Sequence, residues 1–281
     1  MYLDANNLYG WAMSQPLPTG NFKWIDPETV NLESYNENSE KGIILEVNLK
    51  YPKELHQHHN EYPLAPEKKI ITDDMLSNYA RKLKKENSVS SGKVSKLVTT
   101  LSDKEKYVTH YRNLKQCLEH GMKITKIHRV LEFSQSPWLK EYIDFNTEKR
   151  KNAKNSFEKD FFKLMNNSVF GKTMENLRKR VNIELVTDEK RLNKLSSKPT
   201  YVSSKIFNED LVAIHTKKEK LLLDKPSYVG MCILDLSKIH MYDFHYNYIK
   251  KSTLIASYFL LIPIHFFTIS KVRKIFTKSS G

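Results

Sequence analysis

Alternating apolar and polar positions predict two strands in the first half of the chain. Residues 42–49 (GIILEVNL) start with an apolar run and end in alternation, and residues 124–133 (ITKIHRVLEF) alternate along most of their length. One apolar position in two is typical of a strand that buries one face. The apolar residues 1–3 predict the end of a third strand, directly before Asp4.

Apolar residues at helical spacing predict a helix over residues 105–122, and residues 138–185 are predicted to be helical with one break. Residues 66–96 are polar and basic and predict a surface helix with a loop. Residues 227–248 predict a short apolar strand, YVGMCIL, followed by a helix. Strands and helices that mix without regular alternation indicate the α+β class.

The last segment of the chain differs in character from the rest. Residues 253–269 form a mostly apolar run between lysines, and the run contains Pro263 and His265. It is shorter than the ~20 residues that a membrane-spanning helix needs. We therefore favour a buried or irregular tail and expect no membrane contact, and a basic membrane-associated protein is the least favoured alternative.

Composition and charge narrow the function. The chain has 281 residues, of which 40% are hydrophobic and 28% charged, as expected for a globular protein with a sizeable core. The two cysteines, Cys117 and Cys232, exclude a disulfide scaffold and fit a reducing compartment. The net charge of +14 favours a polyanionic partner, nucleic acid before an anionic membrane surface.

Two other site types are not favoured. His56, His58 and His59 are spaced by two and one, which does not place metal ligands on one helical face, so we expect a solvated loop. The sequence contains neither G-x-x-x-x-G-K-[ST] nor G-x-G-x-x-G, the glycine patterns of P-loop and Rossmann nucleotide sites.

The first stretch with candidate chemistry is Asp4–Gly10, DANNLYG. A strand followed by Asp4 and a turn presents a carboxylate at a sheet edge. Carboxylates suit Mg²⁺ or Mn²⁺ in phosphoryl transfer. An aspartate after a strand is also a common turn former, so this stretch alone does not decide the function.

The second stretch is residues 155–171, where Asn155 and Glu158 predict a capping box at the start of a helix. Two stripes follow at helical spacing. The apolar face consists of Phe157, Phe161, Leu164 and Met165, and the second stripe consists of Lys159, Lys163, Asn167 and Phe170. Ammonium groups suit a triphosphate and an aromatic plane suits a base or sugar. The alternative is an amphipathic helix with a solvated lysine face.

The two stretches together identify a family. DANNLYG followed by KLMNNSVFGK, residues 163–172, resembles family B DNA polymerases. Residues 106–181 and 234–250 look most like the protein-primed branch of linear plasmids, adenovirus-like viruses and Polinton (Maverick) mobile elements. The resemblance covers about residues 1–251. It implies a partial polymerase palm with a helical-hairpin fingers subdomain, and template-directed addition of dNTPs with Mg²⁺ or Mn²⁺.

The first family motif is D-x-x-S-L-Y-P. By resemblance, Asp4 would ligate both catalytic metal ions with help from the Ala5 carbonyl, and Tyr9 would exclude a 2′-hydroxyl by its bulk. Asn7 in place of Ser and Gly10 in place of Pro depart from the pattern.

The second family motif is K-x-x-x-N-S-x-Y-G. By resemblance, Lys163 would hold the incoming triphosphate as a catalytic residue, Asn167 would line the pocket, and Phe170 would pack near the nascent base pair. Lys159 and Lys151 would be supporting phosphate contacts.

The resemblance also divides the chain. It implies five parts: palm with the first motif (1–25), an inserted and palm subdomain (26–137), fingers (138–185), a palm return (186–251) and an aberrant tail (252–281). The expected partners are template-primer DNA, a dNTP and a priming protein. The insertion that contacts the priming protein in the family corresponds to residues 26–105. Because the family's exonuclease domain would precede Asp4, we expect the chain to be a truncated fragment.

One family motif is missing. T-D-T-D-S, which carries the second metal-binding aspartate, should follow Lys251 on a hairpin, but no aspartate occurs after Asp243. Codons permitted for residues 260–271 include a series that encodes this motif when read from the third base of codon 260. We therefore expect the tail to be translated out of frame and the chain to be inactive. A non-catalytic DNA-binding or nucleotide-binding remnant is the alternative.

Overall fold

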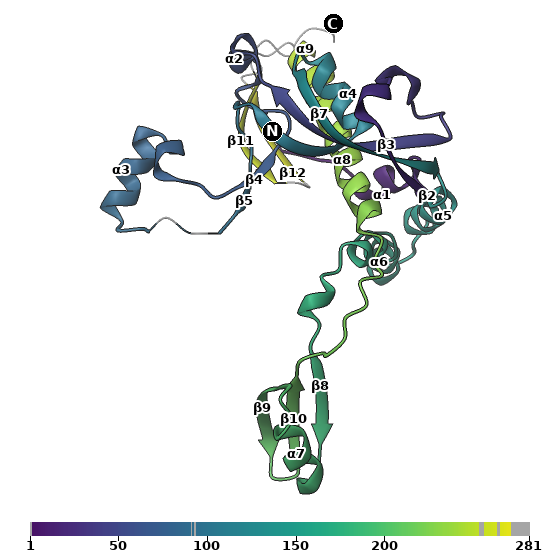
Figure 1. Ribbon diagram of the computed structural model, residues 1–281, viewed down its shortest axis with the longest axis vertical. Helices are drawn as coiled ribbons and strands as arrows, with labels where there is room; N and C mark the ends of the chain where they lie inside the picture. Colours follow the sequence, from purple (N-terminus) through teal and green to yellow (C-terminus); the bar gives the residue numbers. More distant parts are fainter. Residues whose placement is uncertain (1, 91, 93, 253–255, 263–264, 271–281) are drawn as a thin grey trace, which may run out of the picture. The chain divides into compact units, whose positions relative to one another are not determined.

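The computed structural model describes residues 2–90, 92, 94–252, 256–262 and 265–270. The chain divides into two compact units. Unit 1 contains residues 1–167 and 231–281, and unit 2 contains residues 168–230. Helices and antiparallel strands occur in both units, which confirms the α+β class (Figure 1).

The main sheet of unit 1 has four antiparallel strands. Their order is β2 (Leu17–Ile25), β7 (Lys123–Ser136), β3 (Lys41–Lys50) and β6 (Lys104–His110). The two strands predicted from alternation are β3 and β7, and they pair with each other, with Leu45 opposite Val130. The central strand β3 buries Ile43, Leu45, Val47 and Leu49. Alternation therefore identified the strands that form the core.

Two helices complete this core. They are α4 (Tyr111–Glu119) and α8 (Ser227–Asp243), and their buried Leu114 and Tyr242 join the cluster that contains Leu45. The predicted helix over 105–122 is wrong at its start, because residues 104–110 pair with β3 as the edge strand β6. The long-range pairing overrides the local helical spacing.

The predicted strand at the start of 227–248 is also wrong, because the whole run is helical. Val229, Cys232, Ile233 and Leu236 are all buried within α8. Their spacing of three, one and three residues is that of a helix face, whereas the unbroken apolar run resembles a buried strand.

A buried carboxylate fixes α8 to the sheet. Asp235 accepts hydrogen bonds from the Thr109 hydroxyl at 3.1 Å, from the His110 backbone N–H at 2.8 Å and from the Lys238 ammonium at 2.8 Å. The side-chain amide of Gln116 on α4 donates to the Ile239 carbonyl at 2.9 Å. These contacts satisfy polar groups that burial would otherwise leave unpaired.

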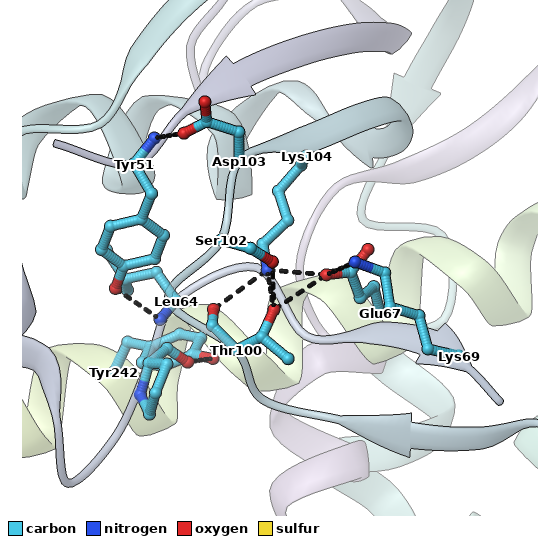
Figure 2. Close-up of polar contacts among 10 residues, drawn as sticks. Tyr51, Leu64, Glu67, Lys69, Thr100, Ser102, Asp103, Lys104 and Tyr242 are labelled. Atoms are coloured by element: carbon cyan, nitrogen blue, oxygen red, sulfur yellow. Dashed lines mark hydrogen bonds and ion pairs between the residues drawn. The ribbon is translucent and has the colours of Figure 1, made fainter. Parts of the chain in front are cut away.

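The segment between β3 and β6 leaves the sheet and returns to it. It contains α2 (His56–His59), β4 (Glu67–Lys69), α3 (Asn78–Glu86) and β5 (Lys96–Val98), and β4 pairs with β5. Figure 2 shows how its two ends are held. The Tyr51 N–H donates to Asp103 at 2.6 Å, and the hydroxyl of Tyr242 donates to the Pro63 carbonyl at 2.8 Å.

Lys104 is the charged centre of this network. Its side chain is 0% exposed, and its ammonium donates to Glu67 at 2.9 Å and to the Thr100 carbonyl at 3.0 Å (Figure 2). Burial lowers the pKa of Lys104, although the hydrogen bond to Glu67 opposes this change. The return of the chain to β6 is therefore tied to β4 by a charged hydrogen bond.

Unit 2 contains a small antiparallel sheet with one helix. The strand order is β8 (Asn182–Val186), β10 (Leu211–Thr216) and β9 (Tyr201–Asn208). Helix α7 (Glu189–Ser196) contributes Leu195 to a cluster with Val186 and Ile214. The prediction of helix up to residue 185 is wrong at its end, because residues 182–186 pair with β10 as β8, and the sequence patterns did not predict β9 and β10.

A second sheet of unit 1 joins the two ends of the chain. The predicted first strand is β1 (Tyr2–Asp4), which pairs with β12 (His265–Ser270), and β12 pairs with β11 (Ala256–Ile262). The apolar run at 253–269 therefore contributes two strands, with residues 253–255 and 263–264 outside the described part. Among the described residues, no helix has both the length and the apolar character needed to span a bilayer.

Candidate active site

The first motif begins where β1 ends. Asp4 is the last residue of β1 and stands opposite His265 in the register with β12, and its side chain lies outside the described part of the structure. Ala5 is half-buried against Leu8 and Met241. The strand therefore places Asp4 at the sheet edge where the sequence predicted it.

The turn after Asp4 depends on both departures from the family pattern. Asn7 has φ 56°, a left-handed conformation that asparagine tolerates, and it precedes α1 (Leu8–Met13). A Cβ on Gly10 would lie 2.2 Å from Nδ2 of Asn7. The Asn7 side chain occupies the space that any larger residue at position 10 would need, so Asn7 and Gly10 fit each other as a pair.

A shared hydroxyl connects the two motifs. Asn7 donates from Nδ2 to Oγ1 of Thr147 at 3.4 Å, and Asn166 donates to the same oxygen at 3.3 Å. Thr147 lies on α5 (Lys140–Lys151) and Asn166 lies on α6 (Ser156–Thr173). The turn of DANNLYG and the helix of KLMNNSVFGK therefore converge within unit 1, although they are far apart in sequence.

The start of α6 agrees with the predicted capping box. The Glu158 N–H donates to Oδ1 of Asn155 at 2.8 Å, and the Glu158 carboxylate accepts from the Lys154 N–H at 2.9 Å. The carboxylate thus reaches one residue further back than in the usual motif. This reciprocal cap fixes where α6 begins.

The predicted lysine stripe is at the surface. Lys159, Lys163 and Asn167 are exposed along α6, and Lys151 is exposed at the end of α5. Phe170 is half-buried and belongs to unit 2. The exposed ammonium groups of Lys159 and Lys163 lie one helical turn apart, which suits contact with successive phosphate groups.

The apolar face of α6 is not part of a core in the described structure. Phe157, Phe161 and Leu164 are 76%, 45% and 63% exposed, whereas the polar Asn166 is 2% exposed. The helix is anchored to α5 through polar groups instead, since the Tyr142 hydroxyl donates to the Met165 carbonyl at 3.3 Å. Helical spacing predicted the element correctly but did not predict which face is covered.

Tyr9 lies on α1 and is half-buried. Burial raises the pKa of its hydroxyl above the usual value of 10.0. The hydroxyl is therefore neutral at physiological pH.

Strands β1 and β12 together supply one carboxylate residue, Asp4, to the edge at which they pair. Among the described residues, no group of three histidine, cysteine, aspartate or glutamate side chains is placed to hold a metal ion. Strand β12, which pairs beside Asp4, contains no carboxylate residue in HFFTIS. Asp4 is the only carboxylate residue of β1 and β12, and two-metal chemistry uses more than one, so no catalytic step through a metal pair follows from these two strands.

The histidine cluster differs from the predicted solvated loop. Residues 56–59 form α2, and His59 is 1% exposed, with Nδ1 2.8 Å from the Tyr51 hydroxyl. The rings of His58, His120 and Tyr246 surround it. Burial lowers the pKa of His59 to about 4, with smaller contributions from the neighbouring histidines. The prediction failed because spacing along the chain does not show which residues pack from other elements.

Comparison with known proteins places these observations in a family. A family model described as DNA polymerase type B, organellar and viral, matches residues 1–251. A search of curated protein sequences gives no match.

Two solved structures share the fold. The chain is similar to phi29 DNA polymerase in an orthorhombic crystal form, with a TM-score of 0.53, 13% identity, and 98% of this chain and 39% of that chain covered. It is also similar to phi29 DNA polymerase complexed with primer-template DNA, with a TM-score of 0.51, 14% identity, and coverages of 96% and 37%. The chain thus spans less than two fifths of the length of these structures. Because the family model matches nearly the whole chain, this chain belongs to the organellar and viral type B DNA polymerases.

Proposed function

We propose that this chain is a truncated fragment of a protein-primed DNA polymerase of the Polinton (Maverick) branch. The ancestral activity is template-directed addition of dNTPs by phosphoryl transfer. The observation that carries the proposal is the Thr147 hydroxyl, which accepts hydrogen bonds from Asn7 in the first motif and from Asn166 in the second. Two motifs that would bind the same nucleotide are therefore both hydrogen-bonded to Thr147.

The proposed nucleotide contacts follow the exposed stripe of α6. Lys163 binds the triphosphate, and Lys159 and Lys151 support it, because ammonium groups neutralise phosphate charge. Asn167 lines the pocket, and Phe170 packs near the nascent base pair. Tyr9, neutral and half-buried, stands under the sugar and excludes a 2′-hydroxyl.

We further propose that the present chain does not catalyse the reaction. Asp4 with the Ala5 carbonyl would supply one side of a Mg²⁺ or Mn²⁺ site, and the second carboxylate is missing from β12. The strands β11 and β12 pair beside β1, and the out-of-frame explanation accounts for the lack of a carboxylate residue in β12. Genomic sequence tests this directly: the hypothesis requires CTG at Leu261 and CCG at Pro263.

The proposed parts and partners follow the family. Residues 1–25, 26–137 and 186–251 would form palm and inserted regions, residues 138–185 the fingers, and residues 252–281 the aberrant tail. Template-primer DNA is the proposed main partner, which suits the net charge of +14. Residues 26–105 are the proposed region of contact with a priming protein.

Nucleotide binding tests the proposal. Equilibrium binding of a fluorescent dNTP should weaken about 10-fold or more in Lys163→Ala, because a charged hydrogen bond is lost. Lys194→Ala is the matched control, since it removes an exposed lysine from α7 in unit 2. Equal affinities in both variants would reject the proposed site.

Primer extension separates the fragment from a working enzyme. With Mg²⁺ and a primed template we expect no incorporation. Incorporation that Asp4→Ala abolishes would overturn the proposed inactivity. Binding of dNTP and DNA without incorporation would also fit the second candidate, a non-catalytic binding remnant, which the missing carboxylate favours.

A further inference from the structure

An aromatic groove lies between the end of α5 and the start of α6, and both helices belong to unit 1 at this point. Its volume is about 650 Å³. Four phenylalanines and five polar or charged residues line it: Phe145, Phe157, Phe161, Phe162, Glu148, Lys149, Asn152, Lys154 and Glu158. The nucleotide stripe proposed above does not include any of these residues.

The phenylalanine rings of the groove are accessible. Phe157, Phe145 and Phe161 are 76%, 57% and 45% exposed. The rings of Phe157 and Phe161 are inclined by only 22°, with centroids 6.4 Å apart. Neighbouring, nearly parallel rings provide a platform on which planar bases stack, and such stacking does not depend on base identity.

Positive charge accompanies the rings. The Lys149 ammonium lies 5.5 Å from the centre of the Phe145 ring, and Lys154 also lines the groove. Of the two acidic lining residues, Glu158 accepts the Lys154 N–H as part of the helix cap. Arg150 follows Lys149 directly on α5 and adds a further positive charge to this end of the helix.

We propose that this groove binds single-stranded nucleic acid, with bases stacked on Phe157 and Phe161 and phosphates near Lys149 and Lys154. A folded apolar partner fits the lining less well, because it would have to bury Glu148, Lys149 and Lys154 without opposite charges of its own. A single strand instead matches both parts of the lining, since it presents planar bases and a charged backbone together.

The stacking pair and the lysines of the nucleotide stripe lie on different sides of α6. At 3.6 residues per turn, Lys159 and Lys163 lie about 200° around α6 from Phe157 and Phe161 respectively. Bases stacked on Phe157 and Phe161 therefore lie away from these two lysines, whereas Phe162 of the groove is only about 60° from Lys159. The inference rests on the proposed DNA partner, but it can be tested without any dNTP.

The test is fluorescence anisotropy of a labelled oligothymidylate with the full chain. The double variant Phe157→Ala with Phe161→Ala should bind about 10-fold or more weakly, because two stacking surfaces are lost. Phe207→Ala is the matched control, since Phe207 is 53% exposed in unit 2 and has the Lys205 ammonium 5.4 Å from its ring. We expect the control to bind as the parent chain does.

Two further measurements make the result decisive. An oligonucleotide of abasic sites retains the phosphates but lacks the bases. It should bind weakly to both the parent chain and the double variant, with the same affinity for each. Lys163→Ala should leave oligothymidylate binding unchanged even though it weakens dNTP binding, so the two proposals can fail separately. Thermal unfolding checks that the double variant is folded.

Three outcomes would overturn the inference. The first is a double variant that binds oligothymidylate as well as Phe207→Ala does. The second is equal affinity of the parent chain for the abasic and base-containing strands. The third is self-association of the parent chain that the double variant abolishes, because the groove would then be occupied by a second copy.

Discussion

The central sheet and helix α6 both have regularly spaced apolar residues, but these residues are buried in the sheet and exposed on the helix. In β3, the apolar positions enter a core, and Leu45 is 1% exposed. In α6, the apolar positions are equally regular, yet Phe157 is 76% exposed. Periodicity therefore identifies the element and its apolar face, whereas burial depends on a partner element that periodicity does not contain. In α6, the uncovered apolar face is a candidate binding surface.

The lysines of the two regions show the same contrast. Lys104 at the start of β6 is enclosed and bound to Glu67, whereas Lys163 on α6 is exposed. Only the second kind of lysine is available to a polyanion. The excess of basic residues therefore has to be divided by location before it supports nucleic-acid binding.

The largest expected effect is on the free energy of unfolding, when a large apolar side chain is replaced by alanine in each of the two regions. Leu45→Ala should lower the free energy of unfolding by about 2–5 kcal/mol, because it leaves a cavity in the core. Phe157→Ala should change it by no more than about 0.5 kcal/mol, because the ring is exposed. Urea unfolding followed by circular dichroism measures both. Similar losses would show that α6 packs more tightly than its exposure indicates.

The next effect concerns the buried carboxylate of α8. Asp235→Ala should cost about 2–4 kcal/mol, because it leaves the His110 N–H and the Thr109 hydroxyl without their acceptor. Lys238→Met is the control and should cost less, since Lys238 is 28% exposed and can be hydrated. A larger loss in the control would mean that the ion pair, rather than the backbone contact, holds α8.

Acid should destabilise the sheet region through its histidines. Burial lowers the pKa of His59 to about 4 and of His245 to about 3, below the usual 6.5. At a pH between the folded-state pKa of each histidine and 6.5, the unfolded chain binds protons that the folded chain does not. The free energy of unfolding should therefore fall as pH decreases from about 6.5 towards 4.

Urea unfolding at a series of pH values measures this slope. The groups that face His59 are His58, His120, His56 and Lys250, all of which disfavour its protonation. His59→Gln retains a polar partner for Tyr51 but does not titrate in this range, so its slope should be smaller. An unchanged slope would show that His59 does not contribute to the acid response.

Local patterns predicted much of unit 1 but little of unit 2. The strands β3 and β7 alternate because they bury one face, and DANNLYG and KLMNNSVFGK indicated both halves of the candidate site. All residues of β9 are exposed, so no burial pattern distinguishes it. The Thr147 hydroxyl was missed for another reason, since a contact between residues 140 positions apart leaves no signal in spacing.

A smaller effect is expected at the enclosed lysine. Lys104→Met and Glu67→Gln should each cost about 1–3 kcal/mol, because each leaves a charge or polar group without its partner. The double variant should cost less than the two single changes together, since no unpaired charge remains. Urea unfolding of all four proteins gives the coupling energy. Additive losses would show that the two side chains act independently.

The smallest effect is expected at an ion pair of the same type on α5. Lys140 and Asp144 lie 2.5 Å apart, but their side chains are 54% and 57% exposed. Water screens exposed charges, and ordering two flexible side chains has an entropic cost, so the coupling energy should be only about 0.3–0.5 kcal/mol. The same double-variant cycle, with Lys140→Met and Asp144→Asn, measures it at low and high salt. High salt should remove this coupling and leave most of the Lys104–Glu67 coupling, because solvent ions reach only the exposed pair. A salt-resistant coupling at Lys140 would show that α5 is covered in solution and that its exposed surface is not free to bind a partner.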